Sequence, residues 1–165
     1  NILGKNLTEY EIQELSDQKE TFYRELYRPH LKAIQGLISF LSKAVELGIP
    51  MAVATAAGQK NIEFILRGLQ IEPFFKAIVG AEVIRNGKPD PEIFLKSAER
   101  LKVTPEACLV FEDSILGIEA AARAGMRAIL IKTSYQPEEL GYQPALWMTI
   151  SNFTDLDIHS LVNSM

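Results

Sequence analysis

The regular order of short apolar runs and helical segments after residue 48 most strongly constrains how this chain folds. Apolar runs of strand length occur at 49–55, 74–79, 107–111, 127–131 and 147–150. Helical segments occur at 37–47, 59–69, 91–101 and 115–124, and a short one follows Asp155. Strand–helix alternation implies parallel strands, right-handed crossovers and helices on both faces of a sheet. The predicted fold class is α/β, a Rossmann-like three-layer α/β/α arrangement.

The first of these runs, at 49–55, does not alternate apolar and polar residues. We therefore expect a strand that is buried on both faces. The stretch before it is different in character, because residues 7–27 contain neither Gly nor Pro and repeat apolar residues at helical spacing. Thr8 followed by Glu11 is a capping-box pattern, which predicts that a helix begins there. We expect this helix to belong to a separate small helical unit.

The charge balance excludes some classes of partner. Of the 165 residues, 17 are Lys or Arg and 21 are Asp or Glu, giving a net charge of −4. A protein that holds nucleic acid by its phosphates needs a basic face, so no nucleic-acid partner is expected. No apolar run reaches membrane-spanning length, so no membrane partner is expected. The single Cys108 excludes an internal disulfide and fits a reducing compartment, and we expect a cytoplasmic monomer.

The first candidate for chemistry is Thr55, which ends the first buried run and precedes a helix. Its hydroxyl, and the backbone N–H groups that begin with Ala56, suit a phosphate oxygen at a helix N-terminus. The alternative is that Thr55 only caps the helix, which is a common role for threonine. A Gly-x-Gly-x-x-Gly turn is absent, so a dinucleotide-binding domain is not predicted.

The second candidate is Lys88, within the sequence Gly-Lys-Pro-Asp-Pro at 87–91. The two prolines stiffen this turn and fix where the lysine points. A held ammonium group can neutralise charge on a transferring phosphoryl group. The alternative is an ordinary solvated lysine before a helix with Asp90 as its N-cap and Pro91 as its first residue.

The third candidate is the pair Glu112 and Asp113, which ends an apolar strand and is followed by Ser114. Two negative charges beside a buried strand are costly unless a cation or hydrogen-bond donors compensate them. Mg²⁺ suits such a place, because it takes hard oxygen ligands and keeps several waters. The alternatives are a solvated pair, or Asp113 as the N-cap of the next helix.

These three places together resemble the second, third and fourth motifs of the haloacid dehalogenase superfamily. The residues that carry the resemblance are Thr55, Gly-Lys-Pro-Asp-Pro at 87–91, and 111–126, where Phe-Glu-Asp-Ser precedes Gly-Ile-Glu-Ala-Ala and Ala-Gly-Met. The chain is most similar to the β-phosphoglucomutase-like branch, over nearly its whole length. The resemblance implies a Mg²⁺-dependent phosphatase or phosphomutase that acts on a small phosphorylated metabolite, and we expect a sugar phosphate.

The resemblance also implies roles for individual residues. Thr55, Ala56, Lys88 and Ser114 would bind the transferring phosphoryl group, with Thr55 and Lys88 acting in catalysis. Glu112 and Asp113 would hold Mg²⁺, directly or through water.

The resemblance divides the chain as well. Residues 1–30 look like a remnant of the family's helical cap domain, and residues 31–165 look like its α/β core. Lys19 falls where cap lysines of this branch often reach the substrate. The alternative for Lys19 is an exposed helix lysine whose head stays in water.

One motif of the family is missing. The family's Asp-x-Asp-Gly-Thr or Asp-x-Asp-Gly-Ser sequence, which carries the nucleophile on the first strand, does not occur here. In the family fold that strand lies between those expected at 49–55 and 107–111, so we expect a gap with unpaired backbone groups. We expect the aspartate nucleophile, which would form an aspartyl-phosphate, to lie outside the given sequence. The alternative is a truncated or non-catalytic module that binds phosphate or a partner without turnover.

Overall fold

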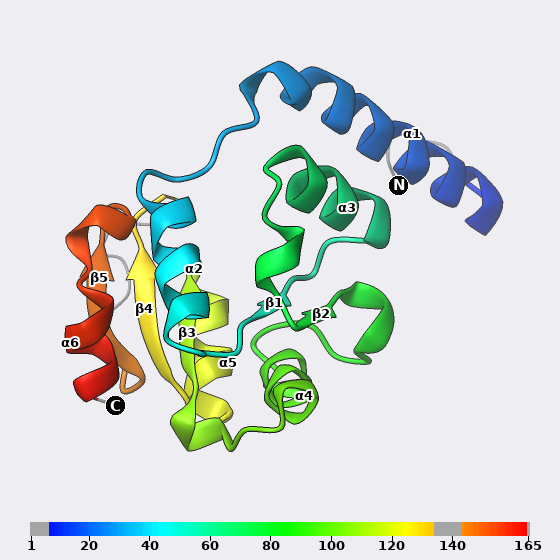
Figure 1. Cartoon of the computed structure of the whole chain (residues 1–165). Coiled ribbons are helices and arrows are strands. Elements are labelled where there is room, and N and C mark those ends of the chain that lie inside the picture. The colour runs from blue at the N-terminus through cyan, green and yellow to red at the C-terminus, as the bar shows by residue number, and fades with distance from the viewer. Residues whose placement is uncertain (1–6, 134–142, 165) are drawn as a thin grey trace.

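The computed structural model describes residues 7–133 and 143–164, which form an α/β fold with parallel strands (Figure 1). The strands are β1 (Ala52–Ala54), β2 (Ala77–Val79), β3 (Leu109–Glu112), β4 (Arg127–Ile131) and β5 (Leu146–Ile150). The helices are α1 (Glu9–Tyr27), α2 (Leu37–Glu46), α3 (Gln59–Gly68), α4 (Glu92–Leu101), α5 (Ile115–Arg123) and α6 (Ile158–Asn163). The predicted fold class is confirmed.

The strands form two separate parallel ladders. β1 pairs with β2, where Ala52 lies opposite Ala77, and β4 pairs with both β3 and β5. Across the molecule the order is β5, β4, β3, β1 and β2 (Figure 1). Within the described residues β1 and β3 are not paired with each other, so each has one edge without a backbone partner. The gap expected between these two strands is therefore present.

Helices on both faces hold the two ladders together. On one face, Ile93 of α4 and Ile118 of α5 are fully buried in a cluster that includes Val79 of β2 and Leu130 of β4. On the other face, Leu37 of α2 packs against both remaining clusters, one beside each ladder. The apolar core is thus continuous across the gap between β1 and β3. Its burial stabilises the arrangement by roughly 25 cal/mol per Å² of apolar surface.

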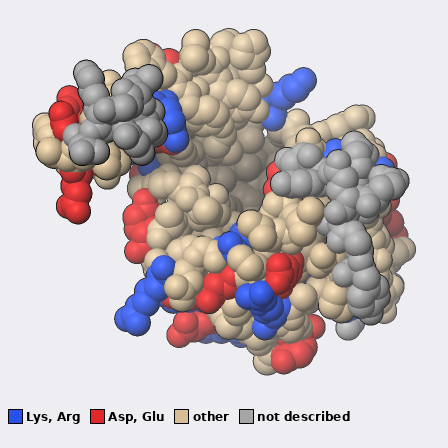
Figure 2. All heavy atoms as spheres, turned by 180° about the vertical axis from the view of Figure 1, so that it is seen from behind, with Lys and Arg blue, Asp and Glu red and all other residues tan. Residues whose placement is uncertain are grey.

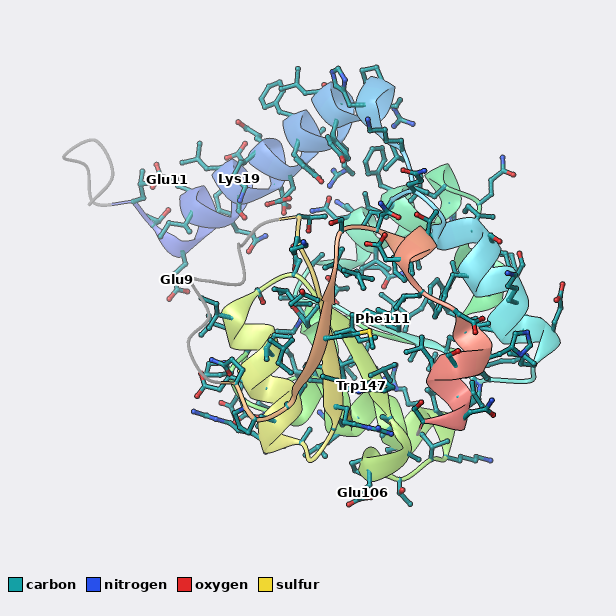
Figure 3. All side chains as sticks on the ribbon, turned by 90° about the vertical axis from the view of Figure 1, so that its left-hand side faces the viewer. Glu9, Glu11, Lys19, Glu106, Phe111 and Trp147 are labelled. Atoms are coloured by element: carbon teal, nitrogen blue, oxygen red, sulfur yellow. The ribbon has the colours of Figure 1, made fainter. Side chains whose placement is uncertain are left out.

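Three phenylalanines anchor α2 to the second ladder. The ring centroids of Phe40, Phe111 and Phe153 lie 5.2–5.4 Å apart, within the usual range for aromatic pairs. Phe111 lies in the interior of the fold (Figure 3). The N-cap of α2 is Gly36, whose φ of +81° is left-handed and where a Cβ would collide with the backbone of Phe153 and Thr154. Glycine is therefore required where the chain enters α2.

The helix α1 lies apart from this core and extends over α3 (Figure 1). Its capping box is confirmed, because Thr8 Oγ1 accepts from the Glu11 N–H at 3.2 Å and the Thr8 N–H donates to the Glu11 carboxylate at 2.8 Å. α1 buries no residue. Within residues 7–133 and 143–164, no helix is both long enough and apolar enough to cross a membrane.

Some boundaries differ from the predictions. β1 is shorter than the run at 49–55, and its residues are only half-buried because one edge of the strand has no neighbour. Residues 74–76 lie outside β2, since a 3₁₀ turn occupies Glu72–Phe74. The prediction of Asp90 as N-cap of α4 was wrong by one residue. Pro91 is the N-cap, and Asp90 instead accepts a hydrogen bond from the Glu92 N–H at 2.9 Å.

The packing under the ladders predicts the effect of a core truncation. Ile93→Ala removes a fully buried side chain on α4 and leaves a cavity, so it should lower the free energy of unfolding by about 3 kcal/mol. Leu95→Ala on the same helix, where the side chain is 40% exposed, is the matched control and should cost less than about 1 kcal/mol. Urea denaturation followed by circular dichroism measures both values. Equal losses would contradict the placement of Ile93 in the core.

Candidate active site

A buried ion pair lies at the carboxyl end of β3. The Lys88 ammonium contacts Glu112 Oε1, and the two side chains are only 17% and 6% exposed. The same ammonium lies 5.0 Å from the centre of the Phe94 ring. Removing one member of a buried pair leaves the other charge uncompensated, which is strongly destabilising. The predicted alternative for Lys88, a solvated loop lysine, is therefore wrong.

The second oxygen of Glu112 is held by the start of α5. Glu112 Oε2 accepts hydrogen bonds from the Asp113 N–H at 3.1 Å, the Ser114 N–H at 3.2 Å and Ser114 Oγ at 2.9 Å. Ser114 is the N-cap of α5, and its Oγ accepts from the Gly117 N–H at 3.0 Å. The alternative of Asp113 as N-cap is therefore wrong. A Cβ at Gly117 would overlap the Glu112 carboxylate, so glycine is needed for the carboxylate to lie there.

The loop that carries Lys88 is held in place by the carboxylate of Glu92 on α4. Glu92 Oε2 accepts from the Arg85 N–H at 2.7 Å and the Asn86 N–H at 2.9 Å, while Oε1 pairs with Lys96 at 2.7 Å. Hydrogen bonds from Lys96 and from these two backbone groups lower the pKa of Glu92 from its ordinary 4.5 to about 2. The carboxylate therefore stays charged, and holds this loop, down to acidic pH.

Thr55 lies directly after β1, at the carboxyl end of the other ladder. Its N–H donates to the Val79 carbonyl at 3.0 Å, and its Oγ1 accepts from the Ala57 N–H at 3.1 Å. The N-cap of α3 is Gly58, which makes no side-chain cap, so the alternative that Thr55 caps this helix is wrong. Ala56 is exposed in the turn between them.

The loop after β2 closes the N-terminus of α3. Glu82 Oε1 accepts from the Gln59 N–H at 2.8 Å, and the Ala81 N–H donates to the Ala57 carbonyl at 3.4 Å. Hydrogen bonds from its own N–H and from that of Gln59 lower the pKa of Glu82. A negative carboxylate at a helix N-terminus is favourable, so Glu82 holds the turn after Thr55 in place.

A cavity of about 490 Å³ lies between α1, α3 and the end of β1. Its lining residues are Lys19, Glu20, Tyr23, Val53, Thr55, Ala57, Asn61, Ile62, Ile65 and Leu66. Seen from behind, the surface is hollowed beneath α1, and most atoms in the hollow belong to uncharged residues (Figure 2). Lys19 is 73% exposed and pairs with Glu20 at 2.7 Å. Lys19 and Glu106 lie at opposite ends of the molecule (Figure 3).

The sequence-predicted residues therefore form two groups. Lys88, Glu112 and Ser114 are in direct contact at the end of β3, whereas Thr55 and Lys19 line one cavity at the end of β1. Sequence reasoning missed Glu92, Glu82 and Asn61. The signal for Glu92 was its position two residues after Asp90, at the start of the helix that follows the Lys88 turn. No local pattern marked Glu82 or Asn61, because their partners lie 23 to 41 residues away.

The site offers two carboxylates to a metal ion. Within the described residues, no group of three or more His, Cys, Asp and Glu side chains could hold a metal. Mg²⁺ is usually held by one or two carboxylates together with waters and substrate phosphates, so the carboxylate of Asp113 fits it directly. Both oxygens of Glu112 already have partners, so Glu112 fits Mg²⁺ through a bridging water. Glu112 is engaged by Lys88 and the start of α5, while Asp113 is exposed to solvent.

The steric relation between Gly117 and Glu112 yields a prediction. Gly117→Ala should displace the Glu112 carboxylate and leave Lys88 without its buried partner, lowering the free energy of unfolding by about 3 kcal/mol. Gly87→Ala is the matched control, because nothing lies within 4 Å of a Cβ placed there. Urea denaturation of both variants measures the difference, and a tolerated Gly117→Ala would contradict the position of Glu112.

The depressed pKa of Glu92 yields a second prediction. Its folded pKa of about 2 lies below the ordinary 4.5, so its contribution to stability is present above pH 4.5. That contribution is lost as the pH falls from 4.5 toward 2. Glu92→Gln should therefore be less stable than the native protein at pH 6, and the difference should shrink at pH 3. Denaturation at both pH values tests this, with the exposed Glu99→Gln on the same helix as control. A difference that grows at pH 3 would contradict the role of Glu92.

Comparisons with known proteins place this chain in a family. Residues 2–131 match the haloacid dehalogenase-like hydrolase family. A phosphorylated carbohydrates phosphatase of Thermotoga maritima is 37% identical over 126 residues, covering 72% of this chain and 58% of that protein. The chain spans about half the length of the curated relatives it matches. It covers 41% of a chloroplastic 5-amino-6-(5-phospho-D-ribitylamino)uracil phosphatase of Arabidopsis thaliana, to which it is 27% identical over 93% of its own length.

Two solved structures share the fold. A HAD hydrolase of Entamoeba histolytica superposes with a TM-score of 0.83 at 28% identity, over 98% of this chain and 74% of that one. A β-phosphoglucomutase of Clostridium difficile superposes with a TM-score of 0.81 at 26% identity, over 95% and 68%. With the family match covering most of the chain, this protein belongs to the haloacid dehalogenase-like hydrolases.

Proposed function

We propose that this chain forms most of a Mg²⁺-dependent phosphatase or phosphomutase for a small phosphorylated metabolite. The observation that carries the proposal is the buried Lys88–Glu112 pair at the carboxyl end of β3, beside the exposed carboxylate of Asp113. Ligands of open parallel sheets bind at this edge. A fixed ammonium next to two carboxylates supplies positive charge for a phosphoryl group and oxygen ligands for a cation.

The nucleophile in this proposal is an aspartate that lies outside the given sequence, on a strand between β1 and β3. This position is supported by β1 and β3, each of which has one unpaired edge within the described residues. Buried backbone groups need hydrogen-bond partners, and a strand between these edges would supply them. A parallel strand in that position would end beside Lys88 and Thr55. Its carboxylate oxygen would form a bond to phosphorus while the bond from phosphorus to the leaving oxygen breaks, giving an aspartyl-phosphate. Water or a hydroxyl of a second substrate would then attack the phosphorus, and the bond to the aspartate would break.

The residues of this chain would position the phosphoryl group. Thr55 Oγ1 and the Ala56 N–H would donate hydrogen bonds to its oxygens, and Lys88 would neutralise its charge. Ser114 would support the loop, as its contacts with Glu112 and Gly117 indicate. Glu112 and Asp113 would hold Mg²⁺, which when bound withdraws electron density from the phosphoryl oxygens.

The substrate class we propose is sugar phosphates. The support is the cavity of about 490 Å³ that continues from Thr55 to α1, a volume in the range of small-molecule sites. Lys19 lies at its rim and would contact the part of the substrate beyond the phosphate. The Thermotoga maritima relative, named as a phosphatase of phosphorylated carbohydrates, supports the same class.

The test is phosphate release from a panel of sugar phosphates by the natural protein, including any residues that precede Asn1. Turnover should require Mg²⁺, and Lys88→Ala or Asp113→Asn should reduce kcat by about 100-fold or more. Lys76→Ala is the matched control, since Lys76 is an exposed lysine at the amino end of β2 and should leave turnover unchanged.

Two results would contradict the proposal. Turnover that persists after removal of Mg²⁺ with a chelator would exclude the metal-dependent mechanism. Binding of phosphate without turnover of any ester would instead favour a non-catalytic binding module. Thermal stabilisation by inorganic phosphate, lost in Lys88→Ala but kept in Lys76→Ala, separates such a module from a protein that does not bind phosphate at all.

A further inference from the structure

The helix α1 meets the rest of the chain through a polar bridge rather than through apolar packing. Of its 19 residues none is buried, and only Glu20 and Arg24 are half-buried. Both bind Asn61 of α3. Arg24 Nη1 donates to Asn61 Oδ1 at 2.7 Å, and Asn61 Nδ2 donates to Glu20 Oε2 at 2.6 Å.

The chemistry of Asn61 matches its two partners. A carboxamide is an acceptor on one side and a donor on the other, so a single residue can bind a cation and an anion together. Glu20 and Arg24 are four residues apart and therefore lie on the same face of α1, one turn from each other. Hydrogen bonds to charged partners are stronger than those between neutral groups, so the bridge holds α1 against α3 at Asn61.

The bridge extends to the rim of the cavity. Glu20 binds Asn61 with one oxygen and Lys19 with the other, at 2.6 and 2.7 Å. Hydrogen bonds from Lys19 and Asn61 lower the pKa of Glu20, so the carboxylate stays charged. Lys19, Glu20 and Asn61 all line the cavity that reaches Thr55. The position of Lys19 over the cavity thus depends on Asn61 through Glu20.

We propose that Asn61 is a positioning residue that sets substrate selection by holding α1, and with it Lys19, over the cavity. The inference rests on the proposed function, since it concerns which phosphate esters the same site accepts. A sugar phosphate must fit its sugar between α1 and α3. An aryl phosphate such as p-nitrophenyl phosphate lacks the hydroxyl groups that Lys19 and Glu20 would bind, so its binding depends less on the position of α1.

The first measurement is the distance between α1 and α3, which does not depend on activity. Spin labels at Gln18→Cys and Lys60→Cys, both exposed, are placed in a Cys108→Ser background. Asn61→Leu should lengthen and broaden the distance distribution, and so should Arg24→Glu alone. The double variant Glu20→Arg with Arg24→Glu should restore it, because the Asn61 carboxamide can turn over and exchange its donor and acceptor sides.

The matched control is Asp17→Ala. Asp17 lies on α1, and its carboxylate accepts a hydrogen bond from Gln13 of the same helix at 2.9 Å. Thr21 donates to the backbone carbonyl of Asp17, which alanine keeps. The variant should leave the distance unchanged. A distance that stays narrow in Asn61→Leu would overturn the inference, whatever the turnover of the protein.

The second measurement is the ratio of kcat/KM for a sugar phosphate to kcat/KM for p-nitrophenyl phosphate. Asn61→Leu should lower this ratio about tenfold, mainly through KM for the sugar phosphate. Equal losses on both esters would overturn the role in selection. No turnover of either ester by the native protein would refute the proposed function, while the distance measurement would still decide whether Asn61 holds α1.

Discussion

The backbone of a buried strand must find hydrogen-bond partners, and this constraint governs the whole arrangement. β1 and β3 each have a partner on one side only within the described residues, and the ladders they end are joined by helices rather than by backbone pairing. The candidate site residues lie at the carboxyl ends of these same two strands. The separation between β1 and β3 therefore determines whether Thr55 and Lys88 can act on one phosphoryl group.

Glutamates secure the loops around the site in a common way. Glu92 binds the backbone of the Lys88 loop, Glu82 binds the first N–H of α3, and Glu112 binds the first N–H groups before α5. Each carboxylate reaches a backbone segment that would otherwise leave polar groups unsatisfied. Lys96 and these backbone contacts lower the pKa of Glu92, and the N–H groups of Glu82 and Gln59 lower that of Glu82, so both carboxylates stay charged at neutral pH. Such rigid loops suit a reaction that depends on positioning.

The sequence was most informative where the interactions are local. The strand Arg127–Ile131 and the capping box at Thr8 follow from neighbouring residues and were predicted correctly. The half-burial of β1 could not be read from its apolar run, because it depends on the absence of a neighbour in space. Asn61 binds Arg24, which is 37 positions away, and Glu20, which is 41 positions away, so no periodicity could reveal the bridge. The identity of Lys88, Glu112 and Asp113 as candidates came from their order along the chain and from the family resemblance, while their contacts came from the structure.

The most direct test of the account is to locate the covalent phosphate. The natural protein is mixed with a sugar phosphate and Mg²⁺, quenched in acid within its first turnover, digested and analysed by mass spectrometry. The account predicts an acid-stable phosphate adduct on an aspartate outside residues 1–165, in a peptide of strand-forming sequence, and its loss in Lys88→Ala. A phosphate adduct on Asp113, or rapid turnover with no adduct on any aspartate, would contradict it.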